Sequence, residues 1–126
     1  MSFDWVEFLE LAYSLAFNPD SPGPQEAALR SAISRAYYAA FHCALDRACK
    51  EGFVPTNKGS DHYLVREHFN DPNRPSRLRY RIYSDLNRLY ADRRAADYEN
   101  RIAAPQKTAE SAVKMAKRML GNLDNL

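Results

Sequence analysis

The chain of 126 residues lacks several features that would mark a specialised class of protein. It has only four glycines and two cysteines, and no apolar run approaches the roughly 18–20 residues that a membrane span needs. Cys43 and Cys49 lie six positions apart, which does not bring them onto adjacent turns of one helical face, and no Cys/His cluster surrounds them. We therefore expect two reduced thiols, no metal site and no cofactor.

The sequence also lacks the marks of an exported or phosphate-loop protein. Its first seven residues are acidic where a secretory signal would be basic, so we expect a cytoplasmic protein without a membrane segment. It contains no phosphate-binding glycine loop and no Ser/His/Asp arrangement. These absences leave no competing enzyme class with a recognisable signature.

The composition that remains is that of one globular domain over residues 1–126, with 45% hydrophobic and 27% charged residues. The net charge is only +2, but it is unevenly spread, because residues 1–30 are acidic and residues 74–101 carry eight arginines against four acidic residues. Arginine makes bidentate and stacking contacts to phosphate and carboxylate groups. An RNA, a nucleotide or an acidic protein partner would explain the bias, and so would a solvated helix face with its own ion pairs.

Apolar residues recur at helical spacing in five segments that are separated by proline, glycine, asparagine and aspartate. We predict helices over residues 4–17, 25–50, 61–69, 76–98 and 105–120, with Gly121 as the last stop. No segment shows sustained alternation of apolar and polar residues, so we predict no sheet. The expected fold is all-α, an antiparallel bundle of four to five helices.

The fourth predicted helix carries charge where its core stripe should continue. The stripe of Leu78, Ile82, Leu86 and Leu89, extended in steps of four, reaches Arg93 and then Asp97. Burying an unpaired charge is costly, so these two groups must pair, meet water or contact a ligand. They lie four residues apart and can pair with each other.

The second predicted helix carries a polar line of its own. Arg35, Tyr38 and His42 lie at spacings of three and four on the flank of an alanine-rich face. A histidine in such a place is either a satisfied structural group or part of a site. If the second and fourth helices pack antiparallel, this line would converge with the charged pair and the C-terminal tyrosine of the fourth helix in one cleft. The candidate binding residues are therefore Arg35, Tyr38, His42, Arg93, Asp97 and Tyr98.

Three segments in order are similar to one known family. Residues 34–42 (SRAYYAAFH) resemble the signature helix of HEPN-domain proteins, which are small prokaryotic helical bundles. The segment GSDH at residues 59–62, whose helix ends at Phe69, and the segment LYADRRAADY at residues 89–98 agree with that resemblance. It covers residues 25–120. It implies a homodimer, a minimal nucleotidyltransferase as partner, a toxin–antitoxin or defence context and, in some members, RNA cleavage.

The resemblance also suggests roles for single residues. Nucleolytic members carry an arginine followed after four to six residues by a histidine, and Arg93 aligns with that arginine. The position expected to hold the histidine is Glu99, so the catalytic pair is incomplete. Asp97 and Tyr98 match a variant of the motif, in which a tyrosine can be modified by the partner transferase. Arg35 and His42 satisfy the same spacing, but they lie in the wrong helix for the family motif.

Three functional hypotheses follow. The first is a binding module that holds RNA, a nucleotide or a nucleotidyltransferase partner and has little or no catalytic activity. The second is a metal-independent endoribonuclease in which Arg93 stabilises phosphate and His42 or His62 replaces the missing histidine, with Asp97 as a further catalytic candidate. The third is a purely structural partner of a nucleotidyltransferase.

Overall fold

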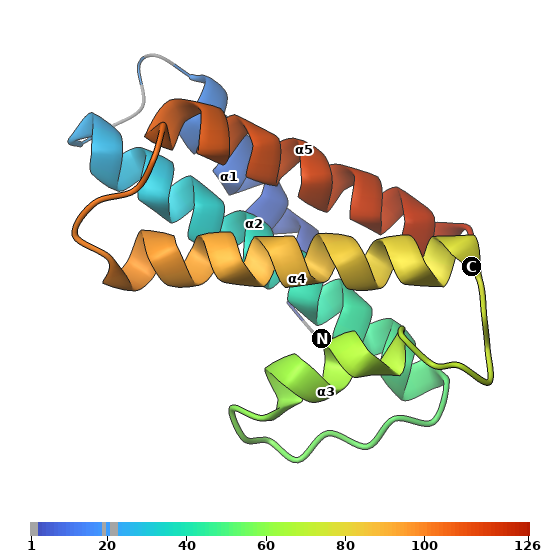
Figure 1. Cartoon of the computed structure of the whole chain (residues 1–126). Helices are drawn as coiled ribbons and strands as arrows, with labels where there is room; N and C mark the ends of the chain where they lie inside the picture. The colour runs from blue at the N-terminus through green and yellow to red at the C-terminus, as the bar shows by residue number, and fades with distance from the viewer. Residues whose placement is uncertain (1–2, 19, 21–22) are drawn as a thin grey trace.

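A computed structural model describes residues 3–18, 20 and 23–126 of the chain, and within them every regular element is an α-helix (Figure 1). The helices are α1 (Val6–Phe17), α2 (Gln25–Lys50), α3 (Asp61–His68), α4 (Arg77–Tyr98) and α5 (Pro105–Asp124). The predicted all-α fold is confirmed. None of the helices in these residues is long and apolar enough to cross a lipid bilayer.

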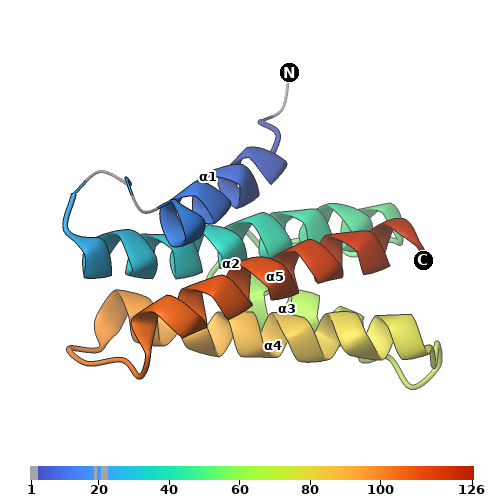
Figure 2. The same cartoon turned by 90° about the horizontal axis from the view of Figure 1, so that it is seen from above.

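Helix α2 is the centre of the bundle. Helices α1, α4 and α5 pack along it, and the short α3 lies against α2 and α4 (Figures 1 and 2). Two contacts fix the antiparallel course of α2 and α4. Near the start of α2, Arg30 donates to the carbonyl of Glu99 at 2.6 Å, and just beyond the end of α2 the carboxylate of Glu51 pairs with Arg79 at 2.9 Å.

The core is built around the small side chains of α2. Tyr37 and Ile33 are the largest fully buried side chains of α2, and several alanines of that helix are equally inaccessible to solvent. Alanine lets a neighbouring helix approach closely, while the larger side chains of the neighbours fill the space between the helices. The fully buried alanines of α2 are Ala32, Ala36, Ala39, Ala40, Ala44 and Ala48.

Helix α5 is longer than its sequence predicts. Gly121 was expected to end it, but the helix continues to Asp124. A glycine inside a helix costs only about 1 kcal/mol relative to alanine. The side chains of Met119 and Leu123, on either side of the glycine, are buried, and their removal from water offsets that cost. The predicted stop at Gly121 was therefore wrong.

The core stripe of α4 also differs from its prediction. The buried stripe follows alternating steps of three and four from Arg79 to Arg93, with Asp85 buried beside it, and the next buried position is Ala96. Leu78 is only half-buried, and Asp97 is exposed at the edge of the helix. Steps of four alone drift away from a helical face, which is why the extended stripe reached Asp97 and missed Arg79. The stripe thus carries a buried arginine at each end.

Glu51 neutralises the first of these arginines. Its carboxylate accepts hydrogen bonds from Arg79 at 2.9 Å and from His68 at 2.8 Å, and Arg47 and Arg74 also pair with it. Burial disfavours the charged carboxylate, but the hydrogen bonds from His68, Arg47 and Arg79 outweigh burial and lower the pKa of Glu51 to about 2. This cluster ties the end of α2 to α3 and α4.

Asp61 fixes the start of α3. Its carboxylate accepts the backbone N–H groups of Thr56 and Asn57 at 2.9 Å each and the hydroxyl of Thr56 at 2.7 Å. The bond from the Thr56 hydroxyl is the main cause that lowers the pKa of Asp61. Because the preceding loop is anchored in this way, the next residue, His62, is held against α2.

Candidate functional site

The guanidinium group of Arg93 lies among three tyrosine rings between α2 and α4. Its guanidinium carbon is 5.4 Å from the ring centres of Tyr37, Tyr38 and Tyr90 alike. Only 7% of the residue is exposed. A cation held over aromatic faces is stabilised by the negative potential of the rings, and more strongly where water is excluded. The three rings therefore make up for part of the hydration that Arg93 loses.

One carboxylate completes the surroundings of Arg93. Asp97 accepts a hydrogen bond from Nη1 of Arg93 at 3.3 Å, and the hydroxyl of Ser34 on α2 lies 3.5 Å from the same carboxylate oxygen. Burial opposes the charge of Arg93, but Tyr38 and Asp97 outweigh it and raise its pKa. Nε of Arg93 is buried without a hydrogen-bond partner. The guanidinium is thus a permanent cation whose hydrogen-bonding capacity the protein uses only in part.

His62 reaches the same centre from α3. Its Nδ1 forms a hydrogen bond with the hydroxyl of Tyr37, and its ring stacks on Phe41 at 4.3 Å between centres. It also lies 5.8 Å from the ring of Tyr90, so His62 and Arg93 border the same two tyrosines. Burial, then the charges of Arg93 and Arg66, lower the pKa of His62. The imidazole is therefore neutral at pH 7, with Nε2 as the nitrogen that Tyr37 does not engage.

The tyrosine beneath this pair is itself held neutral. Burial raises the pKa of Tyr37 well above its ordinary value of 10.0. Its hydroxyl can donate to His62 or accept from it, depending on the tautomer of the imidazole. Tyr37, His62 and Arg93 together form a buried polar group with one positive charge.

Above this group lies a surface on which arginine and tyrosine side chains alternate. The guanidinium of Arg66 lies 4.3 Å from the ring centre of Tyr90 and 5.8 Å from that of Tyr63. Arg94 donates to the hydroxyl of Tyr90 at 3.4 Å, and its guanidinium lies 5.6 Å from the ring centre of Tyr98. Tyr63 and Tyr98 are widely exposed. We call these five residues of α3 and α4 the arginine–tyrosine surface.

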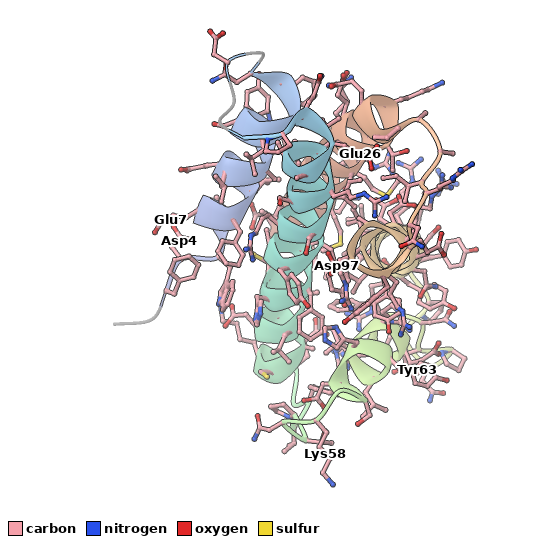
Figure 3. The ribbon with its side chains drawn as sticks, turned by 90° about the vertical axis from the view of Figure 1, so that its left-hand side faces the viewer. Asp4, Glu7, Glu26, Lys58, Tyr63 and Asp97 are labelled. Atoms are coloured by element: carbon pink, nitrogen blue, oxygen red, sulfur yellow. The ribbon has the colours of Figure 1, made fainter. Side chains whose placement is uncertain are left out.

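The structure separates the residues that the sequence assigned to one cleft. It brings Arg93, Asp97 and Tyr38 together and leaves Tyr98 at the exposed end of the arginine–tyrosine surface. Arg35, however, is exposed with its guanidinium over Phe8 of α1 at 5.0 Å, so it lies on the α1 side of α2. Figure 3 shows the two sides, with Asp97 and Tyr63 to one side of α2 and Asp4 and Glu7 to the other.

His42 also belongs to the α1 side. Its ring stacks on Trp5, the residue before α1, with 3.5 Å between centres and 9° between planes. Burial, then the nearby His62, lower the pKa of His42. At about 100° per residue, Tyr38 is turned about 60° from Arg35 while His42 is turned only about 20°, so the polar line divides between two neighbouring helices.

A hollow of about 760 Å³ lies beside the stack of Trp5 and His42, where α1 begins and α5 ends. It is lined by side chains of α2 that include Cys43 and Cys49, both of them free thiols. Burial raises the pKa of Cys43 to about 11, so this thiol is protonated and unreactive at pH 7. Arg93 does not line this hollow, so the hollow is separate from the Arg93 site.

Sequence reasoning missed three further buried charges, those of Asp61, Arg79 and Asp85, and the place of His62. Arg79 and Asp85 are each 7% exposed, and their partners, Glu51 and Arg118, come from distant segments. Arg79 could have been found by running the core stripe of α4 backwards from Ile82. His62 carried no periodic signal, because its position depends on how α3 docks.

In the part of the chain that the structure describes, no three His, Cys, Asp or Glu side chains gather in a way that could hold a metal ion. Comparison of the chain with family models, with curated proteins and with solved structures gives no significant match. The resemblance to HEPN domains therefore stays a prediction from the sequence.

Proposed function

We propose that this protein is a HEPN-like binding module that holds single-stranded RNA on the arginine–tyrosine surface. The observation that carries the proposal is the alternation of cations and aromatic rings along that surface. Tyrosine rings stack on bases of any sequence, and arginine contacts phosphates while its flat guanidinium also stacks. Tyr63 and Tyr98 offer exposed rings, and Arg66 and Arg94 offer charge between them.

The buried group beneath the surface supports the same proposal. Arg93 adds a fixed positive charge that Asp97, which is partly open to solvent, only partly cancels. A positive potential on a surface attracts a phosphate backbone regardless of its sequence. Arg93 is too deeply buried to contact several phosphates, so we assign it to the field beneath the strand and to the placement of Tyr38 and Tyr90.

The experiment is fluorescence anisotropy with a labelled single-stranded RNA of about twelve nucleotides, in chelator and at several salt concentrations. We expect binding that weakens as salt rises. Tyr98→Ala should weaken it by about 1–3 kcal/mol, the range for one stacked base. Tyr13→Ala, which removes an exposed tyrosine from α1, is the matched control and should leave affinity unchanged. Equal affinity for both variants, or no binding at all, would contradict the proposal.

A second candidate, the metal-independent endoribonuclease, is favoured by one observation, the place of His62. Such cleavage needs a base for the 2′-hydroxyl, an acid for the leaving oxygen and a cation at the phosphate. His62 is a neutral imidazole that borders Arg93, which supplies a base and a cation, whereas Glu99 is exposed at the end of α4. The carboxyl group beside them, that of Asp97, is already paired with Arg93 at 3.3 Å and is not free to act as the acid, so we expect RNA to stay intact. Cleavage in chelator that His62→Gln and Arg93→Lys both abolish would establish the nuclease instead.

The resemblance to HEPN domains also suggests an oligomeric state and a partner. We infer a cytoplasmic homodimer that works beside a nucleotidyltransferase in a toxin–antitoxin or defence pair. Light scattering at micromolar concentration should give twice the chain mass. A monomer would remove the dimer from the proposal without affecting the RNA surface. An unrelated gene beside this one would likewise weaken the inferred nucleotidyltransferase partner.

A further inference from the structure

A second basic region lies on another side of α4, where the start of that helix passes the end of α5. Figure 2 shows the two helices running side by side. A hollow of about 430 Å³ opens between them. It is lined by Arg77, Tyr80, Arg81, Ser84, Asp85 and Arg118. Its volume falls within the range of about 300–1,000 Å³ that small-molecule sites occupy.

The one carboxylate in this hollow is already used. Asp85 accepts two hydrogen bonds from Arg118, at 2.7 Å from Nη2 and 3.2 Å from Nε. This bidentate pair holds the guanidinium of Arg118 in place and neutralises the buried acid. Arg77 and Arg81 have no carboxylate within ion-pair distance anywhere in residues 3–18, 20 and 23–126. The hollow therefore keeps two unneutralised guanidinium groups beside a third that is fixed.

The position of these two arginines costs the helix stability. They lie in the first turns of α4, whose first turn has no acidic residue, and cations are unfavourable near the positive end of a helix dipole. Arg79 shares that segment, but the carboxylate of Glu51 accounts for it. Arg77 and Arg81, which are both exposed, have no such carboxylate partner in the described chain. An anion seated between them would be attracted by both guanidinium groups.

We propose that this hollow is a phosphate-binding site, separate from the arginine–tyrosine surface. Its ligand is a phosphate ester, either a free nucleotide or one phosphate of an RNA strand. Arg77, Arg81 and Arg118 contact the phosphate, and the hydroxyl of Ser84 is a further donor. Tyr80 at the rim is 61% exposed and offers a ring for the attached base. Arg81 and Arg93 are twelve residues apart, or about 18 Å along α4, so the site does not depend on the function proposed above.

The test compares two double variants that remove the same charge. Arg77→Gln with Arg81→Gln alters the hollow, while Lys58→Gln with Lys107→Gln removes two exposed lysines elsewhere. All four side chains are exposed, so both variants should fold. The lysine variant should melt at the wild-type temperature, and the arginine variant should melt no lower, because it removes two cations from the start of α4. The probes are AMP and the twelve-nucleotide RNA, and the readouts are two-dimensional NMR titration and the salt dependence of binding.

We expect AMP to shift resonances of the first turns of α4 and the last turns of α5, with at least tenfold weaker binding in the arginine variant and unchanged binding in the lysine variant. AMP binding identifies a nucleotide site. If only RNA binds there, the salt slope of the arginine variant should fall by about 1.4, as for two lost phosphate contacts on a single strand. If neither probe shifts these resonances, or if the two variants bind equally, the phosphate site does not exist. Tyr98→Ala should leave AMP binding unaffected, which separates this test from that of the RNA surface.

Discussion

The polar side chains on the two sides of helix α2 are packed in different ways. On the α1 side, His42 stacks on Trp5 and the exposed Arg35 lies over one ring, so each of these two polar side chains has an aromatic partner. On the α3 and α4 side, Arg93 is buried among three rings and keeps an unpartnered Nε. The first arrangement holds α1 against α2. The second arrangement keeps the positive charge of Arg93 buried, at a cost in free energy that packing alone does not explain. We therefore assign function to the α3 and α4 side.

The largest expected effect concerns the ion cluster that ties the α3 and α4 side together. Glu51→Gln would leave Arg79 buried without a charged partner, and breaking such a pair typically costs about 3–5 kcal/mol. Urea unfolding should show this loss. Asp46→Asn is the control, because it breaks the exposed pair with Lys50 and should cost less than about 1 kcal/mol. Similar losses for both variants would show that the cluster does not stabilise the fold.

Acid provides an independent check of the same cluster. The pKa of Glu51 is lowered from its ordinary value of 4.5 to about 2 in the folded chain. A carboxyl group with a lowered pKa contributes stability that is fully present above its unfolded value and is lost as pH falls through the folded one. Wild-type stability should therefore drop between pH 4.5 and 2, and Glu51→Gln should flatten that part of the profile. Parallel profiles for the two proteins would contradict this assignment.

The next effect compares one arginine from each side of α2. Arg93→Met removes a buried cation from three rings and leaves Asp97 without its partner, so we expect a loss of about 1–3 kcal/mol. Arg35→Met removes an exposed cation from a single ring and should cost about 0.5–1 kcal/mol at most. Thermal unfolding of the two variants measures the difference. An equal or larger loss for Arg35→Met would mean that the two sides are not distinct.

The smallest effect is a spectroscopic one on the α1 side. Trp5 is the only tryptophan in the chain, and its contact with His42 makes its fluorescence sensitive to the charge of that ring. Burial, then His62, lower the pKa of His42, so emission should change with a midpoint below 6.5. His42→Gln should remove the transition. A midpoint at or above 6.5 would show that His42 is more open to solvent than its stack with Trp5 implies.

The spacing of residues along the chain predicts some of these features and not others. The five helices follow from apolar spacing and proline positions, because both are local properties of the chain. Arg93 was found because it interrupts a local stripe. The approach of His62 was not, since it depends on the docking of α3 through Asp61 and Glu51. The contact of Arg93 with Tyr90, three residues before it on the same helix, is local and could have been predicted from that spacing. Arg35 and His42 were assigned to the cleft because their spacing could not tell which neighbouring helix each would face.

If RNA binds to the α3 and α4 side of α2, its footprint on the backbone amide resonances of the protein will lie on those two helices. Titration of the twelve-nucleotide RNA into labelled protein should shift the resonances of Tyr63, Arg66, Tyr90, Arg94 and Tyr98. The resonances of Trp5, Tyr13 and Arg35 should stay in place. Shifts concentrated on α1 and the hollow beside His42, with α3 and α4 unchanged, would show that RNA does not bind to the arginine–tyrosine surface.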